Sequence, residues 1–295
     1  MLTGRQISPS LRNNLRGLGV LTAWGILPLL IGVLLAQVVA PRPVVGLIRL
    51  ETDIWSSSAN LILAQIEETR LDPRIRAVVV QIDSPGGEVV ATQTLFLEMQ
   101  NLRKRMPVVS SIDGIAASGA YYLAMATDPI YAKPSSTVGN IGVWGFAPPE
   151  VGITDALLAS GPFKLTASNR TEFIRLIDSI KQEFVATVFN ARGDRLKIST
   201  ADLAQGLAYP GRDALNLGLI DHLGTLTDAL NEAAYRAGVY NYEVVDLQAR
   251  AIARLYGSTP FLLEPWFGAA EPLTGRRTLP PGVYLLYDTR LGGAP

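Results

Sequence analysis

The sequence predicts an α/β fold built on a parallel sheet that helices cover on both faces. Short apolar runs rich in β-branched residues alternate with segments of helical spacing between residues 44 and 144. Parallel strands joined by helices are buried on both faces and therefore read as continuous apolar runs. A chain of 295 residues that is 48% hydrophobic and 18% charged has ample material for such a core.

The expected elements follow one another from residue 44 onward. Strands are predicted at 44–50, 77–82, 108–112, 130–132 and near 141–144, and helices at 58–70, 89–105 and 118–126. A further strand passing into a helix is expected within 244–256, before prolines interrupt regular structure. Two strand-to-helix turns, 83–87 and 114–118, should then meet beyond the carboxyl ends of neighbouring strands, where ligands bind in such folds.

The residues of these two turns suit acyl transfer. Ser118 stands at the start of a predicted helix, and the N–H of Gly119 has no partner inside that helix. Gly87 can supply a second amide because glycine lets the backbone approach a substrate closely. Ser118 is therefore the candidate nucleophile, with Gly87 and Gly119 as candidate oxyanion donors. Asp83 could act as the acid of a triad, but an aspartate in such a turn is expected to bond its own backbone.

The composition excludes several other chemistries. Cysteine is absent and His222 is the only histidine, so a thiol nucleophile, a cysteine zinc site and a histidine-rich metal cluster are excluded. The apolar neighbours of His222 predict a structural or surface role. Formal net charge is zero and no basic stripe is present, which argues against nucleic acid as a partner.

A serine without a histidine needs another base, and a lysine can serve once desolvation or a nearby cation lowers its pKa. The chain has five lysines: Lys104, Lys133, Lys164, Lys181 and Lys197. Lys164 lies between Phe163 and Leu165 on a predicted loop, whereas the others lie at element ends or among charged residues. It is the best candidate for the general base; the alternative is an ordinary surface lysine.

The first forty residues form a separate module. Residues 17–40 contain no charge, and at about 1.5 Å rise per residue such a helix crosses a hydrocarbon core of roughly 30 Å. Arg5, Arg12 and Arg16 precede it, which places residues 1–16 in the cytoplasm and residues 41–295 on the other side of the membrane. A cleaved signal peptide is the alternative, but Pro41 would then be the first mature residue.

Four sequence blocks resemble the S49 family of signal peptide peptidases, short type, which has a ClpP/crotonase-like fold of repeated ββα units. The blocks are residues 83–87, 116–122, 139–143 and 218–221, in the family's order. The resemblance implies a Ser118–Lys164 dyad, because residues 160–164 are similar to the family's Ser-Gly-x-x-Lys segment. It also implies Gly87 and Gly119 as oxyanion donors, no cofactor or metal, and a homo-oligomeric ring whose sites are shared between subunits.

The chain departs from the family pattern in several places, among them His222, where the family commonly has glutamate. Asn140 replaces a serine that orients the lysine in family members, and its amide oxygen can accept the same hydrogen bond. Residues 144–149, which should line the substrate groove, look shortened. The peptidase domain is expected at 41–245, followed by a C-terminal extension, 246–295, of unknown role.

The sequence therefore predicts a membrane-anchored serine endopeptidase acting on signal-peptide remnants or membrane-protein fragments. Its anchor helix would contact membrane lipid. Two alternatives stay open: a catalytically silent scaffold or partner in membrane-protein quality control, and a crotonase-like acyl-CoA enzyme. An apolar patch within 261–267 would contact a membrane, a neighbouring subunit or its own domain.

Overall fold

The computed structural model describes residues 17, 19–20, 22–32, 41–147, 160–161, 163–164, 166–256 and 283–286. The chain forms two compact units, Met1–Arg42 and Pro43–Pro295. The strands and helices predicted from residue 44 onward and the candidate site residues all belong to the second unit.

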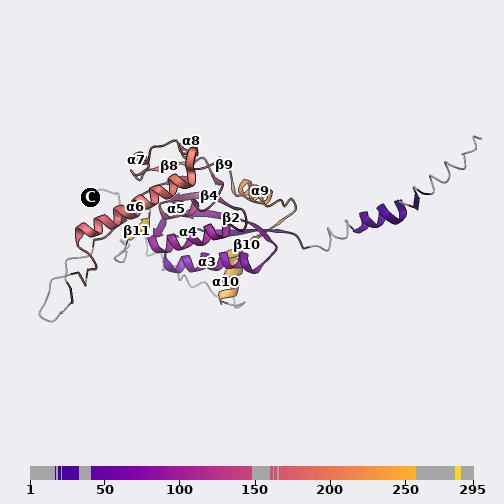
Figure 1. Cartoon of the computed structure of the whole chain (residues 1–295), viewed down its shortest axis with the longest axis horizontal. Coiled ribbons are helices and arrows are strands. Elements are labelled where there is room, and N and C mark those ends of the chain that lie inside the picture. Colours follow the sequence, from indigo (N-terminus) through magenta and orange to yellow (C-terminus); the bar gives the residue numbers. More distant parts are fainter. Residues whose placement is uncertain are drawn as a thin grey trace, which may run out of the picture. The chain divides into compact units, whose positions relative to one another are not determined.

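An eight-stranded sheet forms the centre of the second unit (Figure 1). Its main path is β10 (Glu243–Asp246), β1 (Val44–Leu50), β2 (Ile75–Ser84), β4 (Val108–Ala117), β5 (Ile130–Ala132) and β9 (His222–Leu223), and every neighbouring pair is parallel. The short β6 (Thr137–Gly139) runs parallel to the end of β4, and β8 (Ala208–Pro210) pairs antiparallel with β6. The predicted parallel sheet is confirmed.

Helices cover both faces of this sheet. One face packs on α3 (Ser56–Leu71), α4 (Val89–Arg103) and α5 (Gly119–Ala124), while α9 (Leu226–Arg236) covers the other. Side chains along β2 alternate between the two faces: Val78 and Val80 belong to the larger core, and Ala77 and Val79 to the smaller one. Successive side chains of a strand point to opposite faces, so a strand buried on both sides is apolar throughout.

The remaining helices lie around this centre. They are α6 (Arg170–Arg192), the short 3-10 helix Gly193–Arg195, α7 (Thr200–Leu203), α8 (Gly211–Asn216) and α10 (Leu247–Tyr256). The predicted passage from strand to helix is confirmed by β10 and α10, which packs on α3 and β1. Leu247 is fully buried. The apolar patch predicted within 261–267 lies outside the described residues.

The strand predicted near 141–144 is wrong. The chain forms β6 before it and the two-residue β7 (Trp144–Gly145) at its end, with no strand at residues 141–143. Gly139 and Asn140 both have positive φ, 108° and 51°, and this left-handed backbone ends the strand.

A second, smaller sheet lies beside the first. It consists of β3 (Gly86–Glu88), β11 (Val283–Leu286) and β7, in that order, with β11 antiparallel to both neighbours. It joins the first predicted turn to a segment close to the C-terminus.

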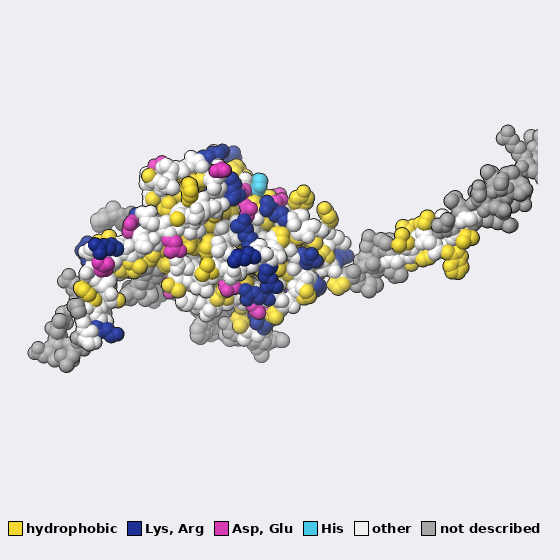
Figure 2. All heavy atoms as spheres, in the orientation of Figure 1, with side chains coloured by type: hydrophobic (Ala, Val, Ile, Leu, Met, Phe, Trp, Pro, Cys, Tyr) yellow, Lys and Arg dark blue, Asp and Glu magenta, His cyan; other side chains and the backbone are white. Residues whose placement is uncertain are grey.

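The described part of the first unit is helical. Residues Thr22–Ile26 form a π-helical turn that continues as α-helix to residue 32. Its side chains are uncharged and exposed, with Trp24 at 83% (Figure 2). Among the described residues, no helix combines the length and apolarity needed to span a membrane. The predicted span at 17–40 falls partly outside them.

Candidate active site

The two predicted turns lie side by side. β2 and β4 extend into these turns, to Ser84 and Ala117, and pair there with Ser84 opposite Ala116, so the predicted turn at 114–118 is mostly strand and only Ser118 lies beyond it; β3 contacts α5. The Asp83 carboxylate links the turns by accepting a hydrogen bond from the Ile115 N–H at 3.0 Å. The prediction that Asp83 bonds its own backbone is therefore wrong, because the neighbouring strand offers a free amide. Within the turn itself, the Ser84 hydroxyl accepts from the Gly86 N–H at 3.2 Å.

Ser118 occupies a strained position between β4 and α5. Its backbone has φ 53° and ψ −120°, a region that costs a non-glycine residue about 1–3 kcal/mol and that occurs at functional sites. Its N–H donates to the Gly139 carbonyl at 2.8 Å and its carbonyl accepts from the Tyr122 N–H at 2.9 Å. The hydroxyl does not cap the helix, and among the described residues it forms no hydrogen bond. A strained strand-to-helix turn of this kind presents a nucleophilic serine.

Two backbone amides near this serine are candidate oxyanion donors. The Gly119 N–H begins α5 and, within the described part of the chain, donates to no acceptor. The Ile54 N–H donates to the Gly86 carbonyl at 2.8 Å, and the Glu88 N–H donates to the Ile54 carbonyl at 2.7 Å. Because successive peptide groups of a strand alternate in direction, the Gly87 N–H points away from Ile54. A Cβ at Gly87 would overlap the backbone of Ile54, so the position requires glycine.

Comparison with known proteins supports this interpretation of the geometry. Residues 100–240 match the family model described as peptidase family S49, and residues 45–138 match a Clp protease model. A putative protease of Methanocaldococcus jannaschii is 32% identical over 67% of this chain and 68% of its own length. The chain belongs to peptidase family S49. It is a serine peptidase, and its α/β sheet is of the Clp protease type.

Two further matches have lower sequence identity. A putative signal peptide peptidase SppA of Enterococcus faecium is 29% identical over 57% of this chain, and the match spans about half (53%) of that relative. A solved structure of a mutant of the 1510-N membrane-bound stomatin-specific protease, in complex with a substrate peptide, has a TM-score of 0.48 at 16% identity; the match covers 70% of this chain and 93% of that one.

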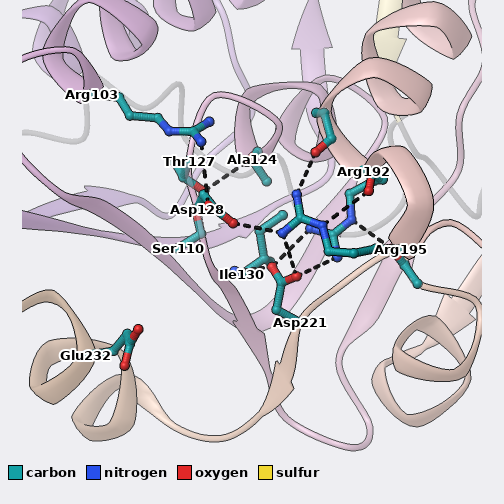
Figure 3. A network of polar contacts seen from close by, with 12 residues as sticks. Arg103, Ser110, Ala124, Thr127, Asp128, Ile130, Arg192, Arg195, Asp221 and Glu232 are labelled. Carbon is teal, nitrogen blue, oxygen red and sulfur yellow. Dashed lines mark hydrogen bonds and ion pairs between the residues drawn. The ribbon is translucent and has the colours of Figure 1, made fainter. Parts of the chain in front are cut away.

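A buried ion pair supports the S49 domain at the start of β5 (Figure 3). The Arg192 guanidinium, at the end of α6, donates to both oxygens of the Asp221 carboxylate at 3.0 and 2.8 Å and to the Gly218 carbonyl at 2.7 Å. Asp221 also accepts from the Ile130 N–H of β5 at 2.8 Å. Burial alone would raise the pKa of Asp221, but the hydrogen bonds and charge of Arg192 outweigh burial and hold that pKa below its ordinary value. The pair thus ties α6 to the strand beside β4.

The sequence contains one overlooked sign of this pair. Arg192 continues the buried stripe of α6 that contains Val185 and Val188, so an arginine at that spacing required a buried partner.

On α5, burial raises the pKa of Tyr122 to about 12, and its hydroxyl donates to Glu183 of α6 at 3.1 Å. These contacts fasten α5, and with it the Ser118 turn, to α6.

The structure describes Asn140 and Lys164, and their predicted roles, orienting the lysine and acting as the general base, stay predictions. The Asn140 side-chain amide donates to the Gly206 carbonyl at 2.8 Å, which leaves its oxygen as an acceptor. Lys164 is exposed on a loop before α6, and its backbone N–H donates to the Gly161 carbonyl at 3.3 Å. Within the part of the chain that the structure describes, the Lys164 ammonium forms no hydrogen bond or ion pair. Figure 1 shows the start of α6 extending beyond the sheet.

His222 lies on the surface, as expected. It is exposed on β9, and its ring lies 4.9 Å from the ring of Tyr131. Such a ring contact is structural, and it leaves the chain without a histidine at the Ser118 turn.

Proposed function

We propose that this serine peptidase is a membrane-anchored endopeptidase that uses a Ser118–Lys164 dyad to degrade signal-peptide remnants and other membrane-associated peptides. The observation that carries the proposal is the Ser118 turn, a strained serine beside the Gly119 and Gly87 amides. No metal or cofactor is required for this chemistry.

The proposed reaction proceeds through an acyl-enzyme. Lys164, as the free amine, takes the Ser118 proton while the serine oxygen bonds to the scissile carbonyl carbon. The amides of Gly87 and Gly119 hold the resulting oxyanion. As the carbon–nitrogen bond breaks, the lysine ammonium gives its proton to the leaving amine. Water then attacks the ester, aided by Lys164, and releases the acyl product with Ser118 restored.

The exposure of Lys164 supports an oligomeric enzyme. A lysine becomes a base through desolvation or a nearby cation, and one chain leaves Lys164 exposed. A neighbouring subunit would bury the loop and bring its lysine to the next serine, as in a ring with shared sites. Exposed apolar side chains on α6, among them Ile174, Leu176 and Phe189, suit such an interface.

The first unit provides the observations that support a membrane anchor. Residues 17–40 are uncharged, and the described helix among them exposes Trp24, Leu27 and Leu29. Apolar side chains exposed along a helix are stable only when lipid or protein covers them. We infer that this segment holds the peptidase unit at the extracytoplasmic face of a membrane.

The test is cleavage of casein and of a synthetic signal peptide by the full chain in detergent micelles. Ser118→Ala and Lys164→Ala should each lose activity by at least about 1,000-fold, as expected for the nucleophile and base of one unit. Lys181→Ala is the matched control, because Lys181 is a surface lysine paired with Asp178 at 2.6 Å, and it should keep full activity. Activity surviving in Lys164→Ala would refute the base; inactive wild type would favour a silent scaffold.

A further inference from the structure

The middle strand of the small sheet comes from the far end of the chain. β11 pairs antiparallel with β3 on one side and with β7 on the other, and β3 and β7 do not pair with each other. The two outer strands therefore border a slot one strand wide. Figure 1 shows β11 near α5, and β11 contacts both α4 and α5.

Both borders of this slot belong to the candidate site. β3 contains Gly87, and β7 begins four positions after Asn140. An extended peptide that adds to two such strands gains main-chain hydrogen bonds on both of its edges. The slot thus has the shape and the hydrogen-bonding groups of a peptide-binding site.

The register of β11 places it directly on the proposed oxyanion amide. Leu285 is opposite Gly87, and Tyr284 is opposite both Glu88 and Trp144. The hydrogen bonds of Ile54 occupy the Gly86 carbonyl and the Glu88 N–H, so the N–H and carbonyl of Gly87 are directed toward β11. Leu285 therefore stands where the substrate residue with the scissile carbonyl would stand.

Ser118 is closed off in this arrangement. The residue is 2% exposed, although a nucleophile must meet its substrate. β11 contacts the helix that follows Ser118, and it fills the slot that leads there. A peptide could reach the serine along this slot only after β11 leaves.

We propose that the slot between β3 and β7 binds an extended peptide as its middle strand, and that residues 283–286 are its resident occupant, a pseudosubstrate strand that substrates must displace. The effect on activity rests on the proposed function, whereas the binding of a peptide to the slot does not. A tethered strand is present at an effective concentration on the order of 1 mM, so it competes strongly with free peptide.

The first test compares two truncations of the full chain. Deleting residues 283–295 removes β11, and deleting 287–295 removes the following residues and keeps it. With a fluorogenic peptide substrate, the first deletion should lower KM by about tenfold at unchanged kcat, because the competing strand is gone. The second should match the full chain. Equal KM values for the two truncations would overturn the competition.

A point-variant pair covers the case in which the longer deletion fails to fold. Leu285→Pro removes the N–H that the register directs at Gly87, and Leu285→Ala keeps it. The proline variant should show the lowered KM and the alanine variant should not. Equal KM values for proline and alanine would contradict the proposed backbone pairing.

The second test needs no catalysis. A fluorescein-labelled peptide of residues 282–287 is titrated into both truncations carrying Ser118→Ala, with a scrambled peptide as control, and binding is read by fluorescence anisotropy. The peptide should bind the chain that lacks 283–295 about tenfold more tightly than the chain that retains β11. Equal binding to both, or to neither, would overturn the proposal. Selective binding by chains that cleave nothing would retain the slot and reject the peptidase mechanism.

Discussion

The Ser118 turn and the Lys164 loop are built in opposite ways. Ser118 is buried, and hydrogen bonds to Gly139 of β6 and Tyr122 of α5 fix its backbone. Lys164 is exposed, and only its backbone is held, by Gly161 of its own loop. One chain thus fixes the position of the proposed nucleophile and of its two proposed amides. It leaves the proposed base to be positioned by a further contact.

Strand pairing explains the difference. β2 and β4 each continue to their turn, and their register places Gly87 and Ser118 at one edge of the sheet. A lysine that serves as the proton acceptor at this edge needs only to reach the edge with its side chain. The strand register imposes no position on Lys164. The comparison predicts large stability effects on the serine side and negligible ones on the lysine side.

The largest expected effect is on the buried ion pair between α6 and the start of β5. Arg192→Met leaves the Asp221 carboxylate buried without its main partner and should lower the free energy of unfolding by about 3–5 kcal/mol. The pair is almost inaccessible, with side-chain exposures of 2% and 9%. Urea denaturation followed by circular dichroism measures the loss.

Arg175→Met is the matched control for this variant. It lies on the same helix, and its ion pair with Glu172 is exposed at 70% and 53%, so it should cost at most about 1 kcal/mol. Equal losses for the two variants would show that Arg192 does not support the serine side specifically.

A smaller loss is expected at the first turn. Gly87→Ala places a Cβ against the Ile54 backbone and should cost about 1–3 kcal/mol by overpacking, with activity reduced because the amide moves. Gly142→Ala is the control, since a Cβ there meets nothing within 4 Å. Thermal melts of both variants decide the comparison. A Gly87 variant as stable as the Gly142 variant would mean that the turn adapts and is not rigid.

The strain at Ser118 should appear as a gain in stability. At φ 53° and ψ −120°, Ser118→Gly should be more stable than Ser118→Ala by about 1 kcal/mol, because glycine tolerates that backbone and alanine does not. Both variants lack the proposed nucleophile and should be inactive. If alanine proved as stable as glycine, the serine would carry no strain of functional significance.

The sequence predicted those elements whose local pattern and tertiary context agree. β1 and β5 are short, mostly apolar runs that contain β-branched or aromatic residues, and their bounds were predicted to the residue. β4 was predicted too short, because Gly114 and the alanines at 116 and 117 form strands poorly by themselves and continue the strand by pairing with β2 and β6. β11 has no partner nearby in sequence, so its pairing with β3 depends wholly on the fold.

The candidate site shows the same contrast between residues that the local sequence pattern predicts and features that depend on the fold. Ser118, Gly87 and Gly119 could be proposed because strand-to-helix turns in a parallel sheet meet at one edge. The positive φ of Ser118 could not be predicted, since serine rarely adopts it and the Gly139 carbonyl imposes it from another strand. The Arg192–Asp221 pair joins residues on separate elements, and sequence spacing does not specify such a partner.

The smallest effect on stability is expected at Lys164, where the effect on activity is large. Lys164→Ala should change the free energy of unfolding by less than about 0.5 kcal/mol, as for an exposed side chain without partners, while activity is lost.

If each site takes its serine from one subunit and its lysine from the next, mixed Ser118→Ala and Lys164→Ala chains, dissociated and reassembled together, contain sites with both groups intact. Random assembly of head-to-tail neighbours makes about a quarter of the sites active, so casein cleavage should recover to about that fraction of wild type. Recovery cannot occur when both groups come from the same chain. An inactive mixture that has formed oligomers would therefore place the dyad within one subunit and require the Lys164 loop to close over its own Ser118.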